Sequence, residues 1–208
     1  MFVSQLSIIT ELRRASKSHS SVPMLQFLVS FLSSVLWLKY GLIKADATIT
    51  FVNSLGTLIA AYILGCFWYY APSRASVETR VLATALTALV LVTLVDRATD
   101  PAAVDAFSLV CCLMTLVFLG SPLSQIGSVV RLRDASVLLP SVTVLAFTNN
   151  VLWTVYGYLH NDPYMLFPNS IGAGLCAGQL ALIAYYGRAA AQAAHTHTGG
   201  TLEMTTVA

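Results

Sequence analysis

Two stretches of this chain repeat each other at a distance of 116 residues. VLWLKYGLIKAD at 35–46 aligns with VLWTVYGYLHND at 151–162, and FVNSLG at 51–56 aligns with FPNSIG at 167–172. Between 35–70 and 151–186, fourteen of 36 ungapped positions are identical. Shared Leu or Val would mean little among apolar segments, but shared Trp, Asn, Gly and Asp residues indicate a duplicated structural unit.

The repeats lie within long apolar segments. These fall at about 22–43, 48–71, 81–95, 104–130, 138–159 and 164–187, with a shortened segment at 1–12. The chain is 57% hydrophobic and only 10% charged, whereas soluble domains carry about 25% charged residues. A spanning helix needs about 20 apolar residues, so the pattern predicts an all-α membrane protein with seven transmembrane helices.

The upstream match extends the duplication to three helices per copy. With a one-residue slip, Ser4-Gln5-Leu6 aligns with Ser121-Pro122-Leu123, and Pro23 aligns with Pro140. We therefore predict a first repeat at 1–71, a linker at 72–103 with an inversion helix at about 81–95, and a second repeat at 104–187. An odd helix between the copies makes them parallel, as in some transporters.

Both ends of the chain depart from this plan. The counterpart of the first helix begins near Ala103, about fifteen residues further upstream than Met1 permits. We expect a start upstream of Met1 rather than a helix that fails to span. Residues 188–208 are polar, small and repetitive, so we expect a disordered cytosolic tail.

Basic residues predict the orientation in the membrane. Eight of the eleven Lys and Arg residues fall in alternate connections. They are Arg13, Arg14, Lys17, Arg74, Arg80, Arg131, Arg133 and Arg188. By the positive-inside rule this side is cytosolic, which places the N-terminus outside or in a lumen and the C-terminus in the cytosol. Lys39 is left over near a helix end, where it can snorkel.

Paired polar and aromatic residues mark the candidate binding site. Asn53 and Asn169 occupy one repeat position, and Trp37 and Trp153 another. Trp37 and Asn53 lie roughly 10 Å and 8 Å from the outer turn, and the second pair is equivalent. Amides bond sugar hydroxyls and indole faces pack on sugar rings, so the four side chains predict a substrate-binding pocket for a sugar.

Each of these residues also has a plainer interpretation. Asparagine can link helices by hydrogen bonds, and tryptophan can belong to an interfacial belt; Trp68 is assigned to such a belt. Ser33 and Asn149 lie four residues before the two tryptophans, on the same helical faces. They either line the pocket or serve packing alone.

Three prolines are candidate hinges. Pro23, Pro122 and Pro140 lie within or just inside apolar segments, and proline removes a backbone hydrogen bond and bends a helix. The alternative for Pro23 and Pro140 is that they only begin their helices.

Other function classes lack their signatures. The sequence shows no catalytic triad, phosphate loop or metal cluster, so we expect no enzyme activity, cofactor or metal. The net charge of +2 gives no basis for nucleic-acid binding. The four cysteines are Cys66, Cys111, Cys112 and Cys176, which lie in apolar runs and are interpreted as small apolar residues.

The paired W-x-x-Y-G-x-x-x-x-D and F-x-N-S-x-G blocks, with S-P-L at 121–123, resemble the SWEET (MtN3/saliva) family of sugar transporters. The resemblance covers residues 1–187 and implies a 3+1+3 helix arrangement and facilitative transport of mono- or disaccharides. It assigns binding roles to Trp37, Asn53, Trp153 and Asn169, and less directly to Ser33 and Asn149. Of four hinge prolines it implies, the fourth is Gln5 here.

The leading hypothesis is a bidirectional uniporter that alternates access to a central pocket, with the sugar and the bilayer as partners and a homo-oligomer allowed by the resemblance. The plasma membrane is favoured over the Golgi or vacuole. The alternatives are a PQ-loop-type carrier of another small solute such as an amino acid, a seven-helix receptor, and a non-transporting assembly factor. The internal duplication argues against a receptor.

Overall fold

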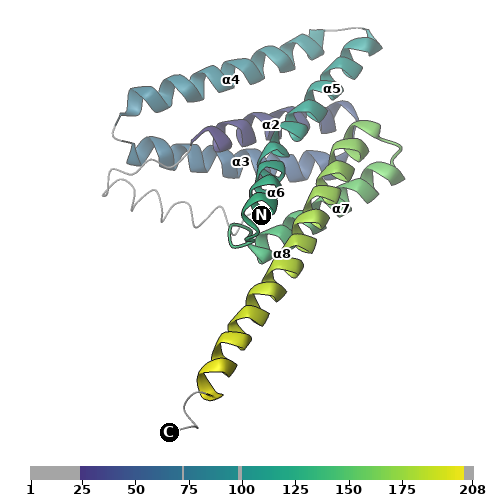
Figure 1. Cartoon of the computed structure of the whole chain (residues 1–208). Helices are drawn as coiled ribbons and strands as arrows, with labels where there is room; N and C mark the ends of the chain where they lie inside the picture. The colour runs from purple at the N-terminus through teal and green to yellow at the C-terminus, as the bar shows by residue number, and fades with distance from the viewer. Residues whose placement is uncertain (1–23, 72, 98–99, 204–208) are drawn as a thin grey trace. The chain divides into compact units, whose positions relative to one another are not determined.

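A computed structural model of the chain describes the backbone of residues 24–71, 73–97 and 100–203 (Figure 1). The predicted segment 1–12, which includes Gln5, lies outside the described residues, and so does the candidate hinge Pro23. All regular structure in the described part is α-helical. The helices are α2 (Leu25–Ile43), α3 (Ala47–Tyr70), α4 (Arg74–Arg97), α5 (Pro101–Phe118), α6 (Gly120–Leu132), α7 (Pro140–Leu159) and α8 (Pro163–Glu203).

Five helical segments in the described residues are long and apolar enough to cross a membrane. They are Leu25–Ile43, Ala47–Tyr70, Arg74–Arg97, Pro101–Leu132, which joins α5 and α6, and Pro163–Tyr186. The expected span at 138–159 forms α7, whose 20 residues match a membrane thickness. It is not among these five segments, because Thr143, Thr148, Asn149 and Asn150 lower its hydropathy. The protein is thus an all-α, multi-pass membrane protein.

Three helix boundaries differ from the sequence prediction. α4 begins at Arg74 rather than near 81, because the polar stretch before the apolar run still favours helix. The predicted segment 104–130 is interrupted at Leu119, two residues before the S-P-L motif. α8 runs to Glu203, so a helix occupies most of the tail expected to be disordered; its alanine-rich composition extends a helix that has already nucleated.

The chain forms two compact units, which divide inside α5 after Met114. This division places α4, the predicted linker helix, in the same unit as the first repeat. Within that unit α2 packs against both α3 and α4. Their shared core consists of Met24, Phe27, Leu28, Ile63, Leu64, Phe67 and Val77.

α4 buries one narrow stripe and exposes apolar residues elsewhere. Val77, Ala88 and Val95 are buried, and spacings of eleven and seven residues return to the same helical face. The exposed large residues of this helix are Leu82, Leu86, Leu89, Val90 and Leu94. An exposed apolar surface of this extent belongs against lipid rather than water.

The turns that join α2 to α3 and α7 to α8 are built alike. Asp46 Oδ1 accepts a hydrogen bond of 2.9 Å from Ile49 N, and Asp162 Oδ1 accepts one of 3.3 Å from Met165 N. Residues 45 and 161 have φ angles of 53° and 51°, the left-handed conformation that reverses the chain. In the backbone, Asp46 N donates to Gly41 O and Asp162 N to Gly157 O. The duplication seen in the sequence is therefore a duplication of hairpin geometry.

Two glycines in each hairpin allow the helices to touch. A Cβ on Gly41 would lie 2.8 Å from Thr50 N, and one on Gly157 would lie 2.7 Å from Leu166 N. Further along, a Cβ on Gly56 would lie 3.0 Å from Ser34 Oγ, and one on Gly172 would lie 2.4 Å from Asn150 Oδ1. Each contact in the first hairpin has its counterpart 116 residues later.

Candidate functional site

The two glycine contacts fix the level of the candidate site within the first hairpin. On α2, Trp37 lies midway between Ser34 and Gly41, two of the residues that contact α3. Asn53 lies midway along α3 between their partners, Thr50 and Gly56. Trp37 and Asn53 therefore lie at one level of the hairpin, as the sequence predicts.

The second hairpin repeats this arrangement. Trp153 lies between Asn150 and Gly157 on α7, and Asn169 lies between their contacts, Leu166 and Gly172, on α8. The residues nominated from the sequence thus form two equivalent pairs. Their role as substrate ligands remains a prediction.

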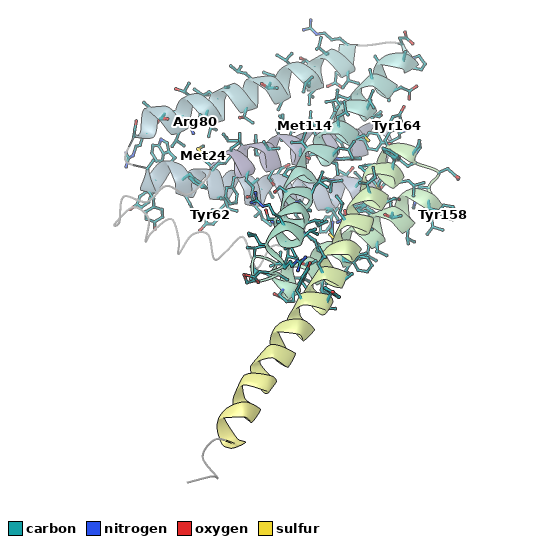
Figure 2. The ribbon with its side chains drawn as sticks, in the orientation of Figure 1. Met24, Tyr62, Arg80, Met114, Tyr158 and Tyr164 are labelled. Atoms are coloured by element: carbon teal, nitrogen blue, oxygen red, sulfur yellow. The ribbon has the colours of Figure 1, made fainter. Side chains whose placement is uncertain are left out.

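Each tryptophan rests against the tyrosine of its own Y-G motif. The Trp37 and Tyr40 ring centroids are 5.1 Å apart at 78°, and those of Trp153 and Tyr156 are 5.6 Å apart at 77°. This edge-on packing restrains each indole. Trp37 is buried, whereas Trp153 is half-buried. By contrast, Tyr62 and Tyr158 are exposed side chains on the same two hairpins (Figure 2).

The two asparagines make the same hydrogen bond. Asn53 Nδ2 donates to Ile49 O at 2.9 Å, and Asn169 Nδ2 donates to Met165 O at 2.7 Å. Both bonds run to the preceding turn of the residue's own helix. They do not join two helices, which weakens the interpretation of these residues as interhelical links. The amide oxygen and the second N–H of each side chain take no part in this bond.

Ser33 and Asn149 behave differently from each other. Ser33 is buried at 8% exposure, whereas Asn149 is exposed. The next residues along, Ser34 and Asn150, instead contact Gly56 and Gly172, where the two helices of each hairpin meet. Asn150 Nδ2 donates to Ala146 O at 2.8 Å. The sequence comparison did not single out this second matched pair, although the 116-residue offset would have found it.

The prolines lie near helix beginnings. Pro140 is the first residue of α7, the position that proline tolerates best. Pro122 is the third residue of α6, just past the interruption at Leu119, where it costs no internal hydrogen bond. Pro168, which the sequence analysis did not consider, lies fully buried inside α8. Hinge roles for Pro122 and Pro140 stay predictions.

One buried polar contact of the second unit was not foreseen. Gln179 on α8 is 4% exposed. Its Nε2 donates to Gln125 Oε1 at 3.2 Å and to Pro122 O at 3.4 Å. The equivalent position in the first repeat is Ile63, which is 2% exposed in the apolar core. The two repeats therefore differ in polarity at this position of their third helix.

The described residues contain no cluster of three or more His, Cys, Asp or Glu side chains that could hold a metal ion. The four cysteines are free thiols. In α2, α3, α7 and the stretch Pro163–Tyr186, the only Asp, Glu, His, Lys or Arg is Lys39. The chemistry that the hairpins offer is therefore that of neutral amides, hydroxyls and aromatic rings.

Comparison with known proteins agrees with this fold and these motifs. Residues 1–75 and 105–191 match the MtN3/saliva family, whose description is "Sugar efflux transporter for intercellular exchange". The chain is 29% identical over 174 residues to the sugar transporter SWEET1 of Danio rerio, covering 83% of this chain and 79% of that protein. It is 28% identical over 179 residues to the bidirectional sugar transporter SWEET11 of Oryza sativa subsp. japonica, covering 84% of this chain and 57% of that protein.

The solved structure of a eukaryotic SWEET transporter has the same fold. It superposes with a TM-score of 0.81 at 23% sequence identity, and the match covers 90% of both chains. Since the family match covers both repeats, the resemblance stated from the paired motifs is confirmed, and this chain belongs to the MtN3/saliva (SWEET) family of sugar efflux transporters.

Proposed function

We propose that this protein is a facilitative, bidirectional uniporter of mono- or disaccharides. The observation that carries the proposal is the doubled hairpin, which sets a tryptophan and an asparagine at one level in each repeat. Membership of a family described as sugar efflux transporters supports the substrate class. The name of the SWEET11 relative supports movement in both directions.

The proposed pocket uses the two pairs jointly. Asn53 and Asn169 supply amide groups to sugar hydroxyls, while Trp37 and Trp153 offer ring faces to the C–H surface of the sugar. Ser33 adds a hydroxyl beside the first pair. In alternating access the two repeats rock about this pocket, with bends at Pro122 and Pro140 contributing.

Transport is proposed to be independent of a proton gradient. Proton-coupled carriers need an ionisable group within the membrane. Of the described spans, those of the two hairpins contain no Asp, Glu or His. The sugar therefore moves down its own gradient.

Uptake into proteoliposomes tests the uniport mechanism. With purified protein and labelled glucose or sucrose, the initial rates with and without an imposed pH gradient should agree within about twofold. Protein-free liposomes give the background. Uptake that occurs only with the gradient would overturn uniport, and uptake of amino acids in preference to all sugars would favour a PQ-loop-type carrier.

The proposed topology places the C-terminus in the cytosol and the N-terminus outside or in a lumen. The basic residues Arg74, Arg80, Arg131 and Arg133 then face the cytosol. The plasma membrane is the proposed location, and homo-oligomers are part of the proposal only through the family resemblance.

A further inference from the structure

Lys39 is the single basic residue inside the apolar part of α2, and the linker helix supplies its partner. Its ammonium group forms an ion pair with the carboxylate of Asp96 on α4. The Lys39 side chain is 18% exposed and that of Asp96 is 52% exposed. Besides snorkelling, the role expected from the sequence, Lys39 thus makes a defined contact between two helices.

The position of Lys39 on α2 shows which face of the helix this contact holds. The side chain of Lys39 contacts Asp96 on α4, so Lys39 lies on the face of α2 that is turned toward α4. Trp37 precedes Lys39 by two residues, which places it about 160° away around the helix at 100° per residue. α4 therefore contacts one face of α2, and Trp37 lies on nearly the opposite face.

The other end of α4 is also fixed to the first repeat. Trp68 Nε1 on α3 donates to Glu78 Oε1 on α4 at 2.7 Å. The Arg74 guanidinium lies over the Trp68 ring, 4.6 Å from its centre. Arg80 lies in the first part of α4, and Met24 directly precedes α2 (Figure 2). α4 therefore runs along α2 from this end to the Lys39–Asp96 pair.

This contact is specific to the first repeat. The residue equivalent to Lys39 in the second repeat is Val155, which is 49% exposed. The family match stops at residue 75 and resumes at 105, so Asp96 lies outside the matched sequence. A residue of the linker therefore contacts a helix that carries a candidate binding residue.

We propose that Asp96 is a positioning residue for sugar binding: by holding Lys39 it fixes the rotation of α2 and thereby the direction of Trp37. The inference rests on the proposed sugar pocket. Without the pair, α2 keeps only its contacts with α3 and with the first part of α4, so its rotation is less tightly defined and the indole is less well aligned with the ligand. The expected loss of sugar affinity is limited, since a partly exposed ion pair changes an equilibrium constant by at most about fivefold.

The effect of the same substitution on stability separates a positioning role from a purely structural one. Asp96 is the penultimate residue of α4, where its negative charge interacts unfavourably with the negative end of the helix dipole. Asp96→Asn should therefore leave the thermal stability of the protein unchanged or slightly higher. Positioning predicts weaker sugar binding despite this intact stability.

Equilibrium exchange of labelled sugar across proteoliposomes measures the effect. Asp96→Asn and Lys39→Gln should each raise the half-saturating sugar concentration about two- to fivefold, with unchanged amounts of folded protein. Lys39→Glu should be at least as severe, because it places two carboxylates together. Combining Lys39→Glu with Asp96→Lys should restore the wild-type value to within about twofold.

Asp105→Asn is the matched control, since Asp105 is an exposed carboxylate near the start of α5, the helix that follows α4. It should leave the half-saturating concentration unchanged. If Asp96→Asn behaves like Asp105→Asn, or if the reversed pair fails to rescue Lys39→Glu, the proposal is wrong. A wild-type protein that exchanges no sugar would instead refute the proposed transport function.

A cross-linking experiment tests the contact without any transport. In the full chain with Cys66, Cys111, Cys112 and Cys176 replaced by alanine, cysteines at positions 39 and 96 should be joined by a short bismaleimide. Cysteines at 39 and 105 form the control pair and should not be joined. Equal cross-linking of the two pairs would contradict the packing of α4 on α2.

Discussion

Replacing Asn53 or Asn169 by alanine should lower sugar transport by up to about 100-fold while leaving the protein folded and inserted. Removing an amide that bonds a sugar hydroxyl leaves the hydroxyl without a partner. The lost hydrogen bond costs about 1–3 kcal/mol, which corresponds to a loss of up to about 100-fold in transport efficiency. The fold should survive, because each amide bonds only to its own helix, at Ile49 O and Met165 O. Alanine is also the better helix former. The measurement is uptake into proteoliposomes at matched protein amounts.

The neighbouring serines provide a matched control for both positions. Ser54 Oγ donates to Thr50 O, and Ser170 Oγ donates to Leu166 O, each at 2.7 Å. They have the same kind of bond to their own helix, one residue further along. Ser54→Ala and Ser170→Ala should keep most of the transport rate. Normal uptake by Asn53→Ala and Asn169→Ala would show that the pocket has been assigned to the wrong residues.

Of the glycine-to-alanine substitutions in the two hairpins, Gly41→Ala and Gly157→Ala should cause the largest loss of stability. The new Cβ would lie 2.8 Å from Thr50 N or 2.7 Å from Leu166 N. Both obstacles are backbone atoms, so the helices must separate rather than a side chain turn aside. Overpacking of this kind costs about 1–3 kcal/mol, and the upper end applies here. The expected result is a lower apparent melting temperature and less folded protein on size exclusion in detergent.

Two other glycines give the opposite expectation. A Cβ on Gly65 of α3 or on Gly174 of α8 meets nothing within 4 Å. Alanine there should be neutral or stabilising, by up to about 1 kcal/mol, because glycine weakens a helix interior. If Gly157→Ala melted at the same temperature as Gly174→Ala, the close approach of α7 and α8 would not exist as described.

The sequence could predict the helices and the duplicated hairpin because both depend on local pattern. The length of an apolar run defines a span, and the W-x-x-Y-G…D and N-S-x-G blocks define the turn and the two close contacts. Asp46 and Asp162 each accept a hydrogen bond from the first turn of the following helix, as aspartate at an N-cap position does. The level shared by Trp37 and Asn53 followed from simple counting along the two helices.

Other features depend on which helices pack together, and no local pattern contains that information. The partner of Lys39 is Asp96, which is 57 residues away on a helix assigned only a linking role. Likewise, Gln125 and Gln179 meet across α6 and α8 at a separation of 54 residues. The break at Leu119 follows from the proline nearby, which the sequence analysis treated as a hinge within one long helix.

The carrier that we propose requires the paired amides of the two repeats to face one water-filled chamber, and cysteine chemistry tests this requirement most directly. With the four native cysteines replaced by alanine, cysteines at 53 and 169 should react with a water-soluble thiol reagent and be joined by a short bismaleimide. Phe51 and Phe167, which lie two residues earlier and are 64% and 58% exposed, give the control pair. Cysteines at 51 and 167 should react only with a lipid-soluble reagent and stay unjoined. If positions 53 and 169 behaved like this control pair, the two amides would face lipid, and the proposed carrier mechanism would be contradicted.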